Sequence, residues 1–219
     1  MFEPSPTTGA LRQGEILSDV IQVHVQLDGW NPNAEEILLG QKTYPQAIIL
    51  TQDCDLLWDF VERNQSPDKR KEQKFLPNIL FCELLPEGAL RARLKESADK
   101  PSDLWKRIQQ HRDERYHSFP SLQNDEDQAG EGLPPLVADF KRIFTIPSEE
   151  LYLRLTLGCR RRAVLKTPFL QHFAVRFGYY LQRIALPEPH QGETSASTTA
   201  EIAPSEGLGG SLIHRIKLG

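Results

Sequence analysis

The chain has 219 residues, of which 39% are hydrophobic and 26% charged, and its formal net charge is −4. This length suffices for one sizeable core with appendages, whereas so mild a charge does not by itself select a class of partner. No apolar run approaches the roughly 18 residues that span a bilayer, and the N-terminal stretch MFEPSPTTGALRQGE lacks the pattern of a secretory signal. We therefore expect a soluble protein without membrane contact.

Strand patterns dominate the first half of the chain. Residues 21–27 alternate apolar and polar side chains with the period of a half-buried strand, and His24 falls on the polar side. The β-branched run 46–51 and the apolar run 78–85 predict two further strands, separated by turn-rich and charged segments. Residues 56–63, LLWDFVER, either begin a helix or extend the second strand.

Helix patterns dominate the second half. Residues 101–114 predict a helix capped by Ser102, and residues 115–120 a short extended segment. Residues 135–147 predict a bent strand, and residues 148–157 a short helix. A long helix follows over 167–186, in which Phe169, Phe173 and Phe177 recur every four residues and therefore face the core. Strands that precede helices with short links predict an α+β fold with a small antiparallel sheet.

The domain boundaries follow from composition. We expect a flexible N-terminus over residues 1–10, one domain over residues 11–187, and a flexible tail over residues 188–219 that is rich in Gly, Ser and Thr. The tail ends in an amphipathic stretch, residues 211–218, which is a candidate docking peptide.

Three cysteines, Cys54, Cys82 and Cys159, cannot all pair within one chain, so reduced thiols in the cytoplasm are the simplest interpretation. The spacings C-x-x-C and H-E-x-x-H are absent. A glycine loop followed by Lys-Ser/Thr is absent as well, so we expect no cofactor and no nucleotide hydrolysis.

Cys54 stands between Asp53 and Asp55 where a strand ends, a place where functional side chains are often displayed. In a structural interpretation the thiol is a buried apolar group and the aspartates form a turn. In a metal interpretation the thiol, an aspartate and a histidine share an ion. In another interpretation the aspartates alone bind a ligand.

A catalytic interpretation makes Cys54 a nucleophile. Flanking carboxylates such as Asp55 disfavour a thiolate, so a histidine and a cation would have to offset them. His117 or His24 would supply the base, and Arg115 the positive charge.

A resemblance covers residues 11–187. The segments GEIL, AIILTQDCDLL, NILFCELLP, RYHSFP and LVADFKRIFTIPSEEL resemble a group of uncharacterised bacterial proteins that carry a Ser/Thr-Gln-x-Cys-Asp motif at a strand end. In this chain the motif lies at Thr51–Asp55. This resemblance implies no particular chemistry.

The order of these segments also resembles, more faintly, the MazF/PemK toxins. Gly14-Glu15 stands where those toxins have Gly-Asp, AIILT matches their second strand, and RIFTIPSEEL matches their closing phrase. Tyr44-Pro45 lacks the arginine that such toxins use to cleave RNA. The resemblance thus implies a small SH3-like β-barrel followed by C-terminal helices, in a bacterial conflict, toxin–antitoxin or phage-defence setting, more than it implies ribonuclease activity.

Residues 151–187 contain seven Lys or Arg and no Asp or Glu. Candidate binding residues in this stretch are Arg160, Arg161, Arg162, Lys166 and Arg176. Clustered arginines bind phosphates or carboxylates, so the stretch predicts contact with nucleic-acid backbone or with an acidic protein. In the alternative, these cations pair internally with residues 124–127 or with Glu149 and Glu150. No base-reading module is present, so any nucleic-acid binding is expected to be non-specific.

We therefore expect a non-enzymatic binding or regulatory module that contacts RNA or DNA backbone, or a larger acidic protein partner, through this basic C-terminal face. The alternative is a hydrolase, either a MazF-like ribonuclease or a thiol enzyme that uses Cys54 and His117.

Overall fold

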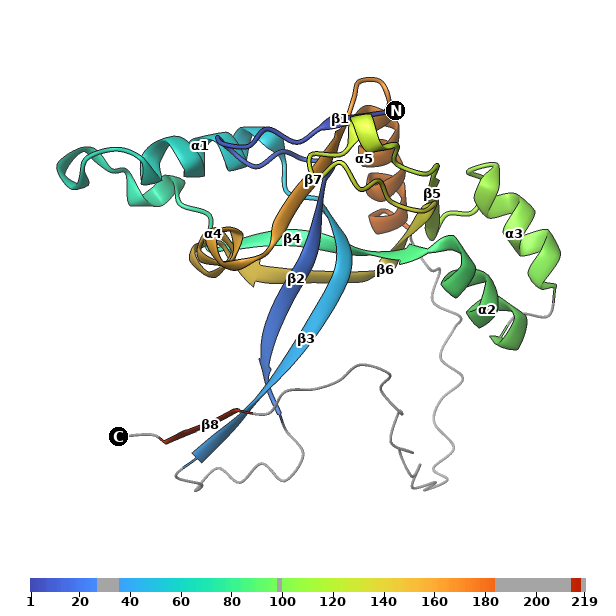
Figure 1. The fold of residues 1–219 in the computed structure, drawn as a ribbon, viewed down its shortest axis with the longest axis horizontal. Coiled ribbons are helices and arrows are strands. Elements are labelled where there is room, and N and C mark those ends of the chain that lie inside the picture. The colour runs from blue at the N-terminus through green and yellow to red at the C-terminus, as the bar shows by residue number, and fades with distance from the viewer. Residues whose placement is uncertain (27–35, 98–99, 184–213, 218–219) are drawn as a thin grey trace, which may run out of the picture.

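The computed structural model describes residues 1–26, 36–97, 100–183 and 214–217 (Figure 1). The strands are β1 (Phe2–Pro4), β2 (Glu15–Val25), β3 (Glu36–Ile49), β4 (Asn78–Pro86), β5 (Tyr116–Phe119), β6 (Leu136–Pro147), β7 (Arg160–Leu165) and β8 (His214–Lys217). The α-helices are α1 (Asp53–Arg63), α2 (Glu87–Ser97), α3 (Pro101–Gln109), α4 (Ser148–Leu157) and α5 (Phe169–Leu181). The described strands pair antiparallel throughout, so the predicted α+β class is confirmed.

The predicted barrel is wrong, because the sheet is open. Its order is β1-β7-β2-β3-β4-β6-β5, and β8 adds to the outer end of β3. Within the described part of the chain, β1 pairs only with β7 and β5 only with β6. Aromatic side chains, and not the backbone hydrogen bonds of a closed barrel, connect these two edge strands. The rings of Phe2 and Phe119 lie 6.1 Å apart, and the ring of Phe173 of α5 lies 5.5 Å from that of Phe119.

The sheet has apolar cores on both faces, because successive strand residues point to opposite sides. One core packs against α5 and includes Ile16, Ile48 and Phe173. The other includes Leu17 and Ile49 and packs against α1 and α4. A third, smaller cluster joins α2 and α3 to β4, β5 and β6. The Phe stripe of α5 is therefore core, as predicted, except at its exposed first member.

The strands β2 and β3 extend past the cores as a two-stranded ribbon (Figure 1). Alternation predicts a buried apolar face here, but Val23 and Val25 are 40% and 45% exposed. His24 is exposed on the same ribbon, as predicted. The alternating pattern predicted the strand correctly, but the burial that it predicted for the apolar face of this strand is wrong.

Three elements lie where the sequence predicts none. β1 occupies part of the segment expected to be flexible, because Phe2 is buried and pairs with Leu165. α2 follows β4 directly, and Leu90 and Leu94 anchor it. β7 lies inside the basic stretch, where Ala163 is fully buried.

Other boundaries differ in detail. Residues 56–63 belong to helix α1 and do not extend β3. α3 has Lys100 at its N-cap and Pro101 in its first turn, in place of the predicted cap at Ser102. The predicted flexible tail lies outside the described residues over 188–213, and part of the candidate docking peptide forms β8.

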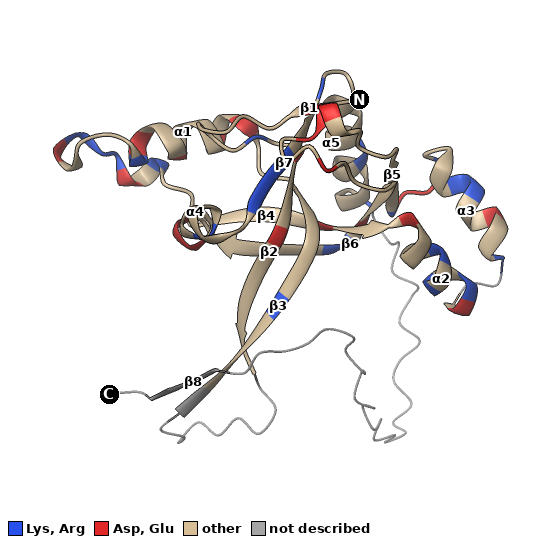
Figure 2. Cartoon of the chain, viewed as in Figure 1, with Lys and Arg blue, Asp and Glu red and all other residues tan. Residues whose placement is uncertain are grey.

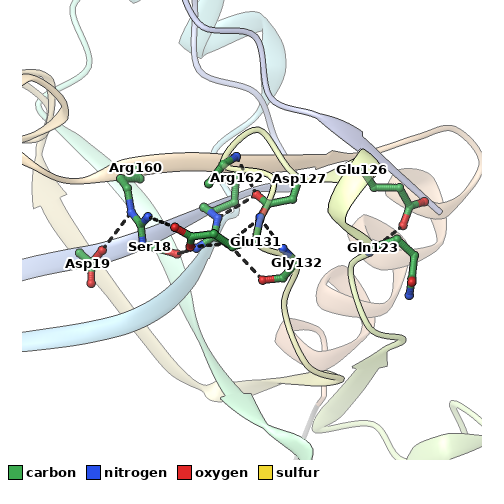
Figure 3. A network of polar contacts seen from close by, with 10 residues as sticks. Ser18, Asp19, Gln123, Glu126, Asp127, Glu131, Gly132, Arg160 and Arg162 are labelled. Carbon is green, nitrogen blue, oxygen red and sulfur yellow. Dashed lines mark hydrogen bonds and ion pairs between the residues drawn. The ribbon is translucent and has the colours of Figure 1, made fainter.

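A buried ion pair fixes the loop between β5 and β6 to β7 (Figure 3). Arg162 donates through Nε and Nη2 to the two carboxylate oxygens of Asp127, at 2.8 and 2.6 Å. It also donates to Ser18 Oγ at 3.0 Å and to the Gly132 carbonyl at 3.1 Å. The exposed fractions of the Arg162 and Asp127 side chains are 2% and 0%.

The carboxylate of Asp127 is saturated with donors. Besides Arg162, the backbone N–H groups of Ala129, Glu131 and Gly132 donate to it at 3.2, 3.1 and 2.8 Å. Burial alone would raise the pKa of Asp127, but these hydrogen bonds outweigh burial and lower that pKa. The ionised carboxylate therefore stabilises the fold above its unfolded pKa of about 3.9, and this contribution is lost as the pH falls below it.

Arg162→Met should destabilise the protein by about 3–5 kcal/mol, because it leaves a buried carboxylate without its counter-ion. Urea denaturation at neutral pH measures this. Arg160→Met is the matched control on the same strand: Arg160 pairs with Glu131 at 2.9 Å, but both side chains are about half exposed. The control should cost at most about 1 kcal/mol, and equal costs for the two variants would contradict the assignment.

Candidate functional site

Cys54 lies in the first turn of α1, just after β3, and is exposed. Its Sγ is 3.7 Å from Gln52 Oε1 and 3.7 Å from Asp55 Oδ1. Both neighbouring atoms are acceptors, and neither is a base of the kind that activates a thiol. The interpretation of Cys54 as a buried apolar group is therefore wrong.

The residues beside Cys54 tie α1 to the rest of the sheet. Asp53 accepts hydrogen bonds from the Gln13 N–H at 2.7 Å and from Arg12 Nε at 3.2 Å. Thr51 Oγ1 accepts one from the Leu80 N–H of β4 at 2.8 Å. The polar residues Thr51 and Asp53 of this motif thus have a structural role, and Asp53 binds the loop before β2.

His117 and Arg115, the expected partners of Cys54, lie on and beside β5. His117 is 3% exposed and packs 5.2 Å from the ring of Phe173. Burial, together with electrostatic repulsion from Arg176 and from the neighbouring imidazoles, lowers its pKa to about 2. Arg115 donates through Nε and Nη2 to Asp139, both at 2.6 Å.

The structure does not bring the thiol and the imidazole together. Among the described residues, the polar neighbours of the Cys54 thiol are Gln52, just before α1, and Asp55 of α1. The ring neighbours of His117 come from β5, β6, α5 and the end of α3. The two sets share no residue.

The predicted binding arginines on β7 are held by internal partners. Arg160 lies 3.4 Å from Asp19 and 2.9 Å from Glu131. Arg161 donates to buried Glu15 at 3.0 Å, and also to the backbone carbonyls of residues 9 and 10 at 3.0 Å each. With Arg162 bound to Asp127, β7 fits the alternative of internal ion pairing, although the acidic partners lie mostly outside residues 124–127.

The other two predicted binding residues differ from each other. Arg176 of α5 donates to the backbone carbonyls of His111, Asp113 and Tyr116. Lys166 is exposed, and no described carboxylate lies within ion-pair distance of its Nζ. Figure 2 shows that Lys and Arg occur on β3, β6, β7, α2 and α3, and not on the C-terminal elements alone.

A cationic pocket of about 450 Å³ lies over β3, β4 and β6. Its lining is Lys42, Tyr44, Glu83, Arg115, Lys141, Arg142 and Ile143. Four cations and one carboxylate thus line this hollow. A second carboxylate, that of Asp139, forms an ion pair with Arg115. We call this set the cationic pocket below.

Carboxylates hold the two arginines of the pocket in place. Arg142 Nη1 donates to Glu83 at 2.7 Å, and Arg142 Nε lies 3.7 Å from Asp139, which also binds Arg115. These hydrogen bonds raise the pKa of Arg115 and of Arg142. The guanidinium groups are therefore pre-oriented, which reduces the entropy lost when they bind an anion.

The two lysines are not held in this way. Among residues that the structure describes, no carboxylate lies within 4.0 Å of Lys42 or Lys141 Nζ. Lys42 Nζ lies 4.3 Å from the centre of the Tyr44 ring, which stacks on Phe144 at 3.8 Å. Burial and Glu83 raise the pKa of Tyr44 to about 12, so its hydroxyl stays protonated and donates to Gln22 at 2.9 Å.

Sequence reasoning missed this pocket, except for Arg115, because its residues come from four separate parts of the chain. The signal it offered was weak: Lys141-Arg142 interrupts an alternating strand, and Lys42 lies in the polar half of β3. The lining contains no His, Cys or Ser. The arrangement, with four cations and one carboxylate, suits binding of an anion.

No protein-family model, curated protein or solved structure matches the chain. In the described ranges, no group of three or more His, Cys, Asp or Glu side chains is arranged to hold a metal ion. Nor does any helix of those ranges combine the length and apolar character that crossing a membrane requires.

Iodoacetamide should label Cys54 alone in the native protein. Cys82 is fully buried, and burial raises its pKa; burial and the nearby Asp19 raise the pKa of Cys159 to about 12. Mass spectrometry of native and urea-unfolded protein at about pH 8 identifies the labelled thiols. Cys54 should react no faster in the native state than in the unfolded chain, because its neighbours are acceptors. A much faster native reaction would revive the thiol-enzyme alternative.

Proposed function

We propose that the protein is a non-enzymatic binding module that holds a nucleic-acid backbone in the cationic pocket. One observation carries the proposal: four cations meet in one hollow, and two of them, Lys42 and Lys141, have no described carboxylate partner. Each phosphate that such cations neutralise releases condensed counterions, which favours binding at low salt.

The lining favours a phosphodiester chain over an acidic protein surface. Protein interfaces are usually anchored by apolar or aromatic side chains in well-packed pockets. The pocket offers exposed Ile143, whereas Tyr44 is 4% exposed and covered by Lys42. A phosphate backbone needs no apolar anchor, and the lining presents none of the flat exposed rings on which single-stranded bases stack. Binding is therefore expected to depend little on base sequence.

The basic C-terminal face contributes less to this proposal than its composition implies. The guanidinium groups of Arg161, Arg162 and Arg176 are occupied by internal acceptors. Exposed Lys166 and half-exposed Arg160 are the members of that face with charge left at the surface. The bacterial conflict setting remains part of the proposal, and it rests on the sequence resemblance alone.

The hydrolase alternative has weaker support. A thiol enzyme needs Cys54 within reach of a base, and His117 lies in a different neighbourhood with a strongly lowered pKa. A ribonuclease needs an acid or a base that is free to act beside the bound phosphate, whereas Glu83 of the cationic pocket is paired with Arg142 and the hydroxyl of Tyr44 donates to Gln22.

Replacing both free lysines, Lys42→Gln with Lys141→Gln, should weaken binding of a fluorescein-labelled single-stranded oligouridine at low salt. The variant keeps the ion pairs of Arg115 and Arg142, so the fold should persist. Fluorescence anisotropy over a salt series measures the effect. The slope of log K against log salt should fall by about 0.7 for each lysine lost.

Lys166→Gln is the matched control, because it removes from the basic stretch an exposed lysine that has no carboxylate partner among the described residues. It should leave affinity and salt slope nearly unchanged. A larger loss in the control than in the double variant would place the interface on the C-terminal face. Binding of poly-glutamate in preference to RNA would favour an acidic protein partner, and absence of binding to both polymers would reject the proposal.

A further inference from the structure

Three histidines from three elements meet under α5. His111 lies two residues past the end of α3, His117 lies on β5 and His172 on α5. Their ring centres are 4.5 Å apart for His111 and His117, 5.2 Å for His111 and His172, and 5.4 Å for His117 and His172. His111 has a φ of 54°, in the left-handed region that side chains other than glycine rarely adopt. The backbone thus departs from its usual conformation at the residue whose ring joins the cluster.

The cluster has an apolar base. His117 is 3% exposed, and its ring lies 4.7 Å from Phe119 and 5.2 Å from Phe173. Within the described part of the chain, Nδ1 of His117 and Nδ1 of His111 are buried without a hydrogen-bond partner. A proton added to either ring would therefore produce a buried cation without an acceptor, which is costly.

The charged groups around the cluster are also mostly positive. Arg176 of α5 lies beside the imidazoles and donates to backbone carbonyls, among them that of Tyr116 at 3.0 Å. The nearby carboxylate of Asp113 already accepts from Arg107 Nη2 at 2.9 Å and from the Arg115 N–H at 3.0 Å.

The remaining acid at this interface is distant and exposed. Glu114 lies 3.9 Å from Arg183, and its side chain is 71% exposed. Described acidic groups thus offer the imidazoles no free counter-ion. The adjacent guanidinium group of Arg176 also disfavours a divalent metal, and no described trio of side chains here is arranged to bind one.

We propose that the cluster of His111, His117 and His172 forms an acid-sensitive latch, which holds α5 on β5 while His111 and His117 are neutral and releases the helix when these two imidazoles take up protons. This inference does not depend on the proposed function.

The direction of the pH effect follows from linkage. Burial and positive neighbours lower the pKa of His117 to about 2, and they lower that of His111 as well. Once α5 has moved away, the imidazoles of His111 and His117 regain an ordinary pKa of about 6.5. The open state therefore binds more protons than the closed state below that pH, and closure weakens as the pH falls through it.

Release of α5 would have a large structural effect. α5 supplies Phe173 to the core that also contains Phe2 and Phe119, at the two free edges of the open sheet. Opening the latch thus exposes the apolar side chains that bridge β1 and β5. The second core, under α1 and α4, shares no residue with the core that contains Phe173.

Hydrogen exchange on the full chain, measured by mass spectrometry, tests the latch. After correction for intrinsic rates, protection of α5 should fall by about thirtyfold or more between about pH 7.5 and about pH 5. Thirtyfold is the change expected when opening restores an ordinary pKa to one histidine. Protection of the central strand β4 serves as internal reference and should fall less. An equal fall in α5 and β4 would indicate global unfolding and overturn the proposal.

His117→Phe should remove about thirtyfold of the pH effect, because the ring remains among Phe119 and Phe173 but cannot take up a proton. His24→Gln is the control, since His24 is exposed on the ribbon, and it should behave like the wild type. A full pH effect in His117→Phe would overturn the latch.

If His117→Phe fails to fold, NMR titration of the wild-type imidazoles decides. His117 should stay neutral until α5 loses protection. Titration of His117 near pH 6.5 with α5 still protected would also overturn the proposal.

Discussion

The buried pair of Arg162 and Asp127 is the contact on which most of the architecture depends. β7 connects β1 to the rest of the sheet, and it would be a poor strand by composition because it begins with three arginines. Each of these arginines has an acidic partner from elsewhere in the chain. Successive strand residues point to opposite faces, so Arg161 with Glu15 and Arg162 with Asp127 hold β7 from its two sides. The cost of burying the charges is offset by the many hydrogen bonds that each carboxylate accepts.

The predictable part of the fold is the part with local patterns. Alternation located β2, apolar runs located the inner half of β3 and β4, and the four-residue spacing of Phe173 and Phe177 located α5. β7 was beyond this reasoning, because Arg162 is buried only through a partner 35 positions away. The short β1 was missed for the same reason, because Phe2 is buried in a core whose other members include residues of β5 and α5.

The candidate site was less predictable than the fold. The cationic pocket draws Lys42, Glu83, Arg115 and Arg142 from separate segments, and only the bent open sheet brings them together. Net charge along the chain was a poor guide, because it counts an arginine equally whether its donors are free or occupied. Arg176 illustrates this: it lies in a stretch without acidic residues, yet its two terminal nitrogens, Nη1 and Nη2, donate to backbone carbonyls within the protein. Free donors, rather than formal charges, identify a surface that binds anions.

One short strand links the pocket and the histidine cluster. β5 is an edge strand of four residues with β6 as its described partner, so few ladder hydrogen bonds hold it. Arg115, which precedes it, forms a wall of the pocket, while His117 packs under α5. Acid in general strengthens the binding of a polyanion, because histidines gain positive charge. Movement of β5 would act in the opposite direction, since it would displace Arg115 from Asp139. A fall in RNA affinity between neutral and acidic pH would therefore report displacement of this strand, whereas a rise would report charge alone and leave the pocket independent of α5.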